Sequence, residues 1–342
     1  MQYSFGILCY NHEWCILELL ESIKYQIQNY GDNIEVFLYL SDDASQDKTV
    51  VIASNWLEEN KLLFKKYEII TTEINKGTTN SYSRLLDKIK TEFFKVIAGD
   101  DVFSQNDIFE ELKKGKKGEA IAYVPLILKD GKLEIPKNLL YNNLIHVNKK
   151  RTHGRDLNNM RFGGYFNTPS FFPTRSLINE KCIDFMRKFL VFEDDPTWYM
   201  LIKTNENLVI TFNTQVKVLY RMHSATVSNS ENISEKWYND SIKLIKYYLK
   251  ENKNIVLHLY LRAHMRDLNN RYLKKKNKGY IGYRIIDKVR RIITKQIGMH
   301  YMTRELNMQF QRECMKNQEY YNLIKEKAEA NYKRIKEKLQ YD

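Results

Sequence analysis

The chain of 342 residues has little of what breaks or cross-links a polypeptide: 13 glycines, 5 prolines and 4 cysteines. So little glycine and proline argues against a disordered chain. The four cysteines lack metal-like spacing, and we expect reduced thiols in a cytosolic protein. No apolar run approaches the roughly 20 residues of a membrane-spanning helix. The first residues lead directly into an expected strand, so we predict no signal peptide.

Apolar and basic residues are plentiful instead. Hydrophobic residues make up 43% of the chain and aromatic residues 13%, which is enough to build a core. The net charge of +13 is uneven, because residues 251–342 hold 22 Lys and Arg against 10 Asp and Glu. The first 250 residues are nearly neutral, and this asymmetry predicts two functional parts.

The first hundred residues alternate between strand and helix patterns. We expect strands at 3–9, 34–41, 67–72 and 93–98, with helices at 13–28, 47–60 and 79–90. Such alternation predicts a mostly parallel sheet with helices on both faces. A G-x-G-x-x-G fingerprint is absent, so a dinucleotide cofactor is not expected.

The rest of the chain is less regular. Short strands are expected at 120–128, 133–135, 209–212 and 216–220, and helices at about 177–188 and 195–204. Lys129-Asp130-Gly131 has the composition of a hairpin turn. From Ser234 onward the pattern is helical, which places a boundary near residue 230.

Two adjacent carboxylates, Asp100 and Asp101, follow the apolar run 93–98. Ligands of open α/β sheets bind beyond the carboxyl ends of the strands. The two charges would repel each other unless a cation lies between them, and a divalent metal that bridges to a diphosphate meets this need. Taken alone, the pair is equally consistent with a solvated turn.

The first three expected strands also end in polar residues: Tyr10-Asn11, the segment 42–47 and Asn75-Lys76-Gly77. A carboxylate such as Asp43 can accept from the N–H edge of a uracil-like base, although the acidic residues here could instead cap the next helix. Gly77 would let the backbone approach a ligand closely, and a plain turn explains it equally well.

Three carboxylates, Glu193, Asp194 and Asp195, open the helix expected at 195. A helix start favours negative charge, so capping is one explanation. The other is a general base that deprotonates an acceptor hydroxyl attacking a sugar carbon. Arg221 and His223 follow the last short strand, where they suit the stabilisation of a departing diphosphate or form a solvated loop.

Taken in order, these segments resemble the inverting family 2 glycosyltransferases of GT-A fold. The resemblance covers roughly residues 1–228 and rests on Tyr10-Asn11, Asp42 to Thr49, Asn75-Lys76-Gly77, Asp100-Asp101, Glu193-Asp194 with Trp198, and Tyr220-Arg221 with His223. It implies an α/β fold: a Rossmann-like, mostly parallel sheet flanked by helices. The catalytic domain would span 1–230, with a nucleotide-sugar half (about 1–102) and an acceptor half (about 103–230). Residues 231–342 would form a basic α-helical extension.

The resemblance also implies roles for single residues. Asp43 would contact the nucleobase, Asp100 the ribose or sugar, and Asp101 would bind Mn²⁺ or Mg²⁺. Asp194 would be the base, with Asp195 and Glu193 left open as alternatives. The other residues implied at the nucleotide-sugar site are Tyr10, Asn11, Asn75, Gly77, Arg221 and His223. The loop 163–170 would line the acceptor side. One departure is the stretch Asn80–Arg84, where the family usually has an Arg-Asn pair.

We therefore expect a metal-dependent inverting glycosyltransferase that uses a nucleotide sugar, most simply a UDP-sugar. Its acceptor would be a hydroxyl of a glycan or lipid-linked molecule in bacterial cell-surface polysaccharide synthesis, such as capsule or lipopolysaccharide. One alternative is a catalytically vestigial GT-A-like protein that binds a membrane or partner. A second is a nucleotidyltransferase, but no Gly-rich phosphate loop is present near the N-terminus.

The basic tail predicts further partners. Within 280–297, five aliphatic residues fall near one helical stripe, and most basic residues lie on or beside the other face. A basic amphipathic helix predicts adsorption to an anionic membrane surface through 270–300. Packing on the catalytic domain, or self-association through the C-terminal helices, is the alternative. No nucleic-acid motif is present, so no nucleic-acid partner is expected. We expect a cytoplasmic protein, at most peripheral on the inner face of the cell membrane.

Overall fold

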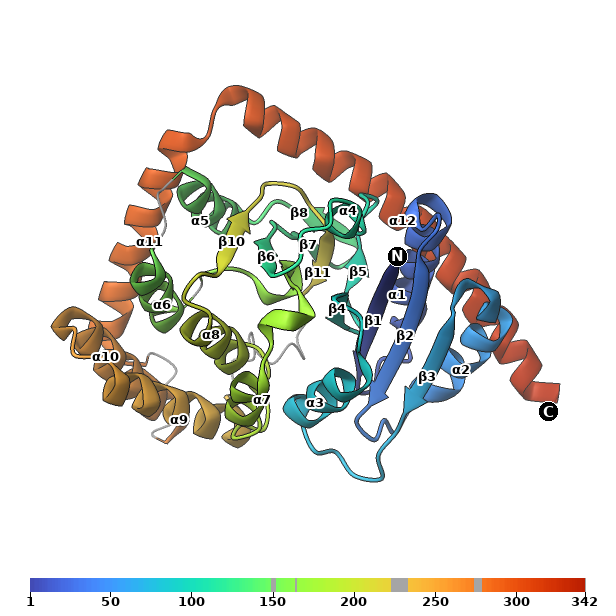
Figure 1. The fold of residues 1–342 in the computed structure, drawn as a ribbon, viewed down its shortest axis with the longest axis horizontal. Coiled ribbons are helices and arrows are strands. Elements are labelled where there is room, and N and C mark those ends of the chain that lie inside the picture. Colours follow the sequence, from blue (N-terminus) through green and yellow to red (C-terminus); the bar gives the residue numbers. More distant parts are fainter. Residues whose placement is uncertain (149–151, 164, 223–232, 274–278, 342) are drawn as a thin grey trace.

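The computed structural model describes residues 1–148, 152–163, 165–222, 233–273 and 279–341 (Figure 1). The N-terminal part contains a parallel sheet of four strands in the order β3-β2-β1-β4. Its strands are β1 (Gln2–Cys9), β2 (Glu35–Asp42), β3 (Lys66–Ile70) and β4 (Phe93–Ala98). The helices between them are α1 (Ile16–Tyr30), α2 (Thr49–Glu59) and α3 (Thr78–Lys88). The α/β alternation predicted from the sequence is confirmed.

Successive residues of β2 show how the sheet is covered. Leu38 and Leu40 belong to an apolar cluster that also contains residues of α1 and α2. Tyr39 points into a second cluster, which contains Leu85 and Leu86 of α3. Because successive side chains of a strand point to opposite faces, helices cover both faces of the sheet.

Two smaller sheets complete the strands. Their orders are β10-β6-β9 and β5-β11-β7-β8. The strands are β5 (Val102–Phe103), β6 (Glu119–Ala122), β7 (Leu126–Lys129), β8 (Lys132–Glu134), β9 (Phe171–Pro173), β10 (Val209–Phe212) and β11 (Val218–Arg221). The single strand expected at 120–128 is wrong, since β6 and β7 belong to different sheets. Pro125 stands between them and cannot donate to a ladder. The predicted hairpin turn is confirmed, with positive φ at Asp130 and Gly131.

Helices fill the remainder of the chain. The middle contains α4 (Glu110–Lys113), α5 (Lys137–Asn148), α6 (His153–Phe162), α7 (Glu180–Met186) and α8 (Asp195–Thr204). Short 3₁₀ turns lie at Lys61–Leu63, Thr168–Ser170 and Arg175–Leu177. The predicted helical extension is α9 (Glu235–Glu251), α10 (Ile255–Tyr272), α11 (Ile281–Tyr301) and α12 (Arg304–Tyr341). Within the described ranges, no helix is both long and apolar enough to span a membrane.

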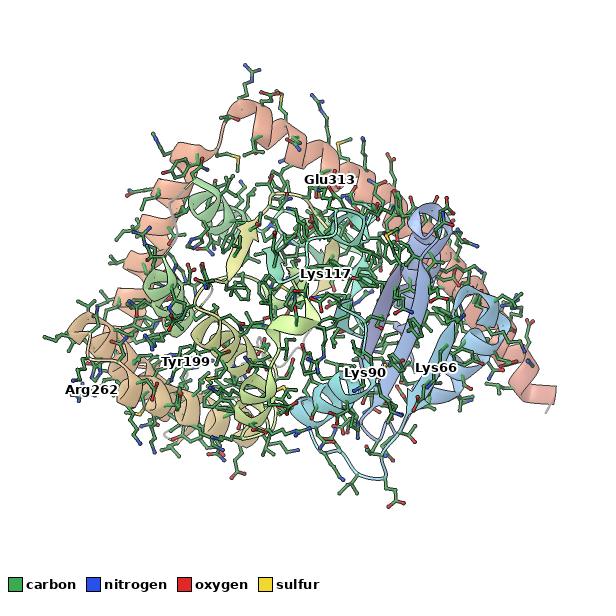
Figure 2. All side chains as sticks on the ribbon, viewed as in Figure 1. Lys66, Lys90, Lys117, Tyr199, Arg262 and Glu313 are labelled. Carbon is green, nitrogen blue, oxygen red and sulfur yellow. The ribbon has the colours of Figure 1, made fainter. Side chains whose placement is uncertain are left out.

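The C-terminal helices wrap around the rest of the chain. Figure 1 shows α11 along the outer side of α5 and α6, and α12 returning to the N-terminal sheet beside α1 and α2. Ala328 and Ile335 of α12 share the apolar cluster of β1 and α1. Tyr199 of α8, labelled in Figure 2, packs against Tyr247 and Tyr248 of α9. The extension is thus part of the core, while the domain boundary near residue 230 stays a prediction.

Candidate functional site

The carboxyl ends of β1, β2 and β4 lie at one edge of the parallel sheet. Cys9 pairs with Asp42 in register, and Leu8 pairs with Ala98. The loops that follow these strands carry Tyr10-Asn11, Asp43 and Asp100-Asp101. The structure therefore brings the predicted nucleotide-sugar residues of the N-terminal half to the same edge, as expected for strands that run in parallel.

The loop after β1 is tied to the loop after β2. Asn11 has a φ of 56°, its N–H donates to Ser45 Oγ at 2.8 Å, and its Oδ1 accepts from the Gln46 N–H at 2.8 Å. Asp47 accepts from the Thr49 N–H at 2.9 Å, just before α2, and from the Glu13 N–H at 3.0 Å, so it joins the same two loops. Tyr10 is exposed beside these ties. Asn11 thus fixes the shape of the edge from which Tyr10 projects.

Asp43 and Gly77 meet directly. The buried Asp43 carboxylate accepts from the Lys76 N–H at 3.0 Å and from the Gly77 N–H at 2.7 Å. Arg84 belongs to the stretch Asn80–Arg84, where the sequence departs from the family pattern. Its Nη2 lies 3.9 Å from the Asp43 carboxylate and places a cation there. Asn75 is exposed on the same loop. These hydrogen bonds hold the Asp43 carboxylate in one orientation. Each of its oxygens accepts one of them and keeps capacity to accept another.

Gly77 also joins the two halves of the chain. Its φ is +90°, and a Cβ built there would lie 2.3 Å from the Leu190 carbonyl oxygen. The Thr79 N–H donates to the same oxygen at 3.3 Å. Further along α3, the ring of Tyr82 meets that of Trp198 edge-on at 6.4 Å. These contacts bring the start of α8 close to the loops of the parallel sheet.

The three carboxylates at the start of α8 influence one another. Asp194 caps the helix by accepting from the Asp195 N–H at 2.7 Å. Burial raises the pKa of all three, and the Asp194 charge is the second cause for Glu193 and Asp195. Hydrogen bonds from the Asp195 N–H and the Thr168 hydroxyl act in the opposite direction on the pKa of Asp194. Water reaches Asp195 most easily, because it is the most exposed of the three, and this weakens its shift.

Asp101 lies at the base of the edge. It is 2% exposed, and its Oδ1 accepts from the Arg221 N–H at 2.9 Å. Burial raises its pKa, and the Asp100 charge adds to that rise. The turn therefore holds a buried carboxylate next to a partly exposed one, an arrangement in which a cation would be favourable.

The sequence analysis missed Lys95, which it treated as part of the apolar run of β4. Burial lowers the pKa of Lys95 to about 7, opposed by the charge of Asp101. Its Nζ donates to the Thr168 carbonyl at 3.2 Å and to the Phe171 carbonyl at 2.9 Å. A lysine inside an otherwise apolar buried strand is the signal that could have found it. Thr168 thus contacts Lys95 through its carbonyl and Asp194 through its hydroxyl. Because the charge of Asp101 acts on Lys95, these contacts connect Asp101 with the carboxylates at the start of α8.

The Asp100-Asp101 turn fits a divalent cation in its donor chemistry. Both side chains offer carboxylate oxygens, the ligands that Mg²⁺ and Mn²⁺ prefer. In the part of the chain that the structure describes, no three His, Cys, Asp or Glu residues cluster as a complete metal site. Water and the phosphates of a substrate would have to supply the other ligands, as is usual for Mg²⁺. Metal dependence stays a prediction.

Arg221 is buried among protein groups. Its Nη2 forms an ion pair with Glu18, its Nε donates to the Asp100 carbonyl at 2.6 Å, and its Nη1 lies 3.5 Å from the Tyr321 hydroxyl. The guanidinium also lies 5.2 Å from the ring centre of Trp14. His223 lies outside the described residues. A contact of either residue with a diphosphate stays a prediction.

Comparisons with known proteins agree with this architecture. The model of glycosyl transferase family 2 matches residues 4–182. No curated protein matches the chain.

Among solved structures, the chain is similar to TarS of S. aureus. TarS 1–349 in complex with UDP-GlcNAc has 16% identity and a TM-score of 0.52, over 100% of this chain and 92% of that one. TarS 1–349 with UDP has 15% identity and a TM-score of 0.52, over 95% and 90%. At such identities the likeness shows the fold alone, and it extends through the C-terminal helices.

Proposed function

Because the chain belongs to glycosyl transferase family 2, we propose that it transfers a sugar from a nucleotide sugar, most simply a UDP-sugar, to an acceptor hydroxyl. Its class is therefore that of a glycosyltransferase, as the sequence predicted, and the fold is the expected α/β GT-A fold with a helical C-terminal part. The match favours this class over a nucleotidyltransferase. The UDP and UDP-GlcNAc complexes of TarS support uridine as the base.

One observation supports the proposal: the acidic residues at the ends of the parallel strands and those at the start of α8 are connected by a short chain of contacts. Asp43 and Asp101 follow strand ends, Tyr82 of α3 packs on Trp198 of α8, and Thr168 contacts both Lys95 of β4 and Asp194. A nucleotide sugar needs contacts to its base, its diphosphate and its sugar carbon. The two strand-end residues suit the first two, and the start of α8 suits the third.

The proposed roles follow from this arrangement. Asp43, held by two backbone N–H groups, would accept from the base, and Asp100 would contact the ribose or sugar. Asp101 would hold Mn²⁺ or Mg²⁺, and such a cation supplies charge compensation for a leaving diphosphate. Asp194 would remove the proton of the acceptor hydroxyl as its oxygen attacks C1 from the face opposite the diphosphate. A single displacement of this kind inverts the configuration at C1.

Asp194 suits the base role better than its neighbours. Burial raises its pKa, which makes it a stronger base than a solvated carboxylate. The hydrogen bonds from Thr168 and Asp195 limit that rise, so the group stays ionised more readily than if it were buried alone. Burial and the Asp194 charge raise the pKa of Glu193 and of Asp195, so both are protonated to a greater extent at neutral pH and are less available to accept a proton.

We propose a glycan or lipid-linked acceptor in cell-surface polysaccharide synthesis, and the surface of α11 supports the lipid-linked case. The aliphatic stripe of this helix is exposed, with Ile281 at 71%, Ile285 at 57% and Val289 at 48%. The opposite side of α11 packs on α5, where a Cβ on Gly298 would lie 2.2 Å from Tyr141 Cβ. Arg284, Lys288, Arg291 and Lys295 are interspersed along the helix.

An anionic membrane surface would receive both the apolar stripe and these cations. Liposome sedimentation with Ile285→Asp tests this proposal, with Leu62→Asp, an exposed apolar residue far from α11, as the matched control. Loss of sedimentation on phosphatidylglycerol vesicles only for Ile285→Asp is expected. A wild-type chain that does not sediment with these vesicles would refute membrane binding. If the wild-type chain instead forms a dimer as its concentration rises, the stripe would mediate self-association.

Calorimetric titration with UDP, CDP and GDP, each with and without Mn²⁺, tests the proposed donor site. We expect preferential binding of UDP, strengthened by Mn²⁺. Asp101→Asn should abolish the effect of Mn²⁺, whereas Asp130→Asn at the exposed hairpin turn should bind as the wild type does. The absence of nucleotide binding under all conditions would contradict the proposal.

A further inference from the structure

The C-terminal helix α12 contacts the segment 100–106, which carries the Asp100-Asp101 turn. Figure 1 shows α12 returning from α11 across the molecule to the N-terminal sheet. The family model ends at residue 182, so this helix lies outside the part that defines the family. Its contacts reach the candidate donor site at two places.

The first place is Arg221. The ring centre of the buried Tyr321 lies 5.9 Å from the guanidinium, and its hydroxyl lies 3.5 Å from Nη1. The same arginine donates from Nε to the Asp100 carbonyl at 2.6 Å and from its backbone N–H to Asp101 Oδ1 at 2.9 Å. An ion pair with Glu18 of α1 fixes the guanidinium from another side. Arg221 therefore contacts α12, α1 and Asp100 through its side chain, and Asp101 through its backbone N–H.

The second place lies at the end of the same segment. Asn317 of α12 is fully buried, and its Oδ1 accepts from the Gln105 N–H at 3.1 Å. Glu313 accepts from Asn106 Nδ2 and from Asn317 Nδ2, the latter at 2.8 Å. Figure 2 labels Glu313 on the stretch of α12 that passes over this region. The helix α12 thus contacts one end of the segment 100–106 directly and the other end through Arg221.

We propose that α12 is a strap that positions the Asp100-Asp101 turn, with Tyr321 and Asn317 as positioning residues that act through Arg221 and Gln105. The inference rests on the proposed donor site. Two carboxylates that hold a cation and a sugar must keep a fixed separation, and a displacement of about 1 Å is costly for catalysis. Arg221, Asn317 and Tyr321 are buried, so a loss of their polar contacts would be unfavourable and the arrangement is held in place.

Two leucine variants separate positioning from general stability. Tyr321→Leu removes the ring beside Arg221. Tyr320→Leu removes an equally buried neighbour on α12, which instead packs edge-on against Tyr25 at 4.7 Å. The two variants should lose similar thermal stability. In UDP-sugar turnover, Tyr321→Leu should raise the donor KM and the Mn²⁺ concentration for half activation by about tenfold, while Tyr320→Leu should change both by less than about twofold. Tyr321→Phe keeps the ring and should recover most of the loss.

Hydrogen exchange provides a readout that needs no turnover. The amides of residues 100–106 should exchange faster in Tyr321→Leu than in Tyr320→Leu, with the rest of the sheet unchanged. Equal effects of the two variants on KM and on exchange would overturn the strap, leaving α12 as a stabilising element only. A wild-type chain that binds no UDP would refute the proposed donor site, and with it the functional meaning of the strap, even if the exchange difference appeared.

Discussion

Replacement of Asp194 by asparagine tests the proposed chemistry most sharply. The Oδ1 of asparagine can still accept from the Asp195 N–H, which Asp194 now does at 2.7 Å, and asparagine caps helices as well as aspartate does. The fold should therefore be retained. The variant loses the negative charge and, with it, the capacity to take a proton. A general base contributes about 10²- to 10⁴-fold, so we expect kcat to fall about a thousandfold, or about 4 kcal/mol.

The assay measures sugar transfer and donor binding on the same preparations. Binding of UDP should stay within about twofold of wild type, because the proposed contact of Asp194 is with the acceptor hydroxyl, which UDP lacks. The pKa of Glu193 and that of Asp195 should both fall, since the Asp194 charge that raises them is gone. Asp195→Asn serves as the matched control and should lose less than about tenfold.

Full transfer activity in Asp194→Asn would refute the reasoning. A thousandfold loss in Asp195→Asn with an active Asp194→Asn would move the base to the neighbouring residue. A loss in both variants together with a lower melting temperature would show that the start of α8 matters for folding rather than for proton transfer.

Two further predictions concern stability. Gly77→Ala should destabilise the fold by about 1–3 kcal/mol, because φ is +90° and the new Cβ would lie 2.3 Å from the Leu190 carbonyl oxygen. Gly115 has a φ of +67° and open space around it, so thermal melts of Gly115→Ala measure the cost of the positive φ without the steric clash. Burial lowers the pKa of Lys95 to about 7, so above that pH the unfolded chain binds a proton that the folded chain has released. Stability relative to Lys95→Met should therefore rise from pH 7 to pH 9 by roughly 2 kcal/mol in urea unfolding. If the difference in unfolding free energy between the two proteins is the same at pH 7 and pH 9, the lowered pKa of Lys95 is contradicted.

The first four strands could be predicted because each is a short apolar run between helices with clear periodicity. β4 begins and ends where expected, at Phe93–Ala98. The strand expected at 120–128 failed because Pro125 divides it between two sheets. α5 was missed because its asparagines are poor helix formers. One of them, Asn143, is buried and donates to the carbonyls of Ala122 and Asn213, which only the folded chain brings together.

The candidate site was partly predictable for a similar reason. Parallel strands end at one edge, so Asp43 and Asp101 could be placed near each other from their positions after strands. The environment of Arg221 could not, because its contact with Tyr321 spans 100 residues and its contact with Glu18 spans 203. Sequence spacing indicates which residues follow a strand, but it does not show which distant side chains bury a charge.

Release of free nucleoside diphosphate from a panel of nucleotide sugars, with Mn²⁺ and with chelator, tests the central claim most directly. It needs no acceptor if the enzyme slowly hydrolyses its donor. The account predicts Mn²⁺-dependent release of UDP from one UDP-sugar, lost with chelator and in Asp101→Asn. Absence of release from every nucleotide sugar, with or without Mn²⁺ and with glycan acceptors added, would contradict the account.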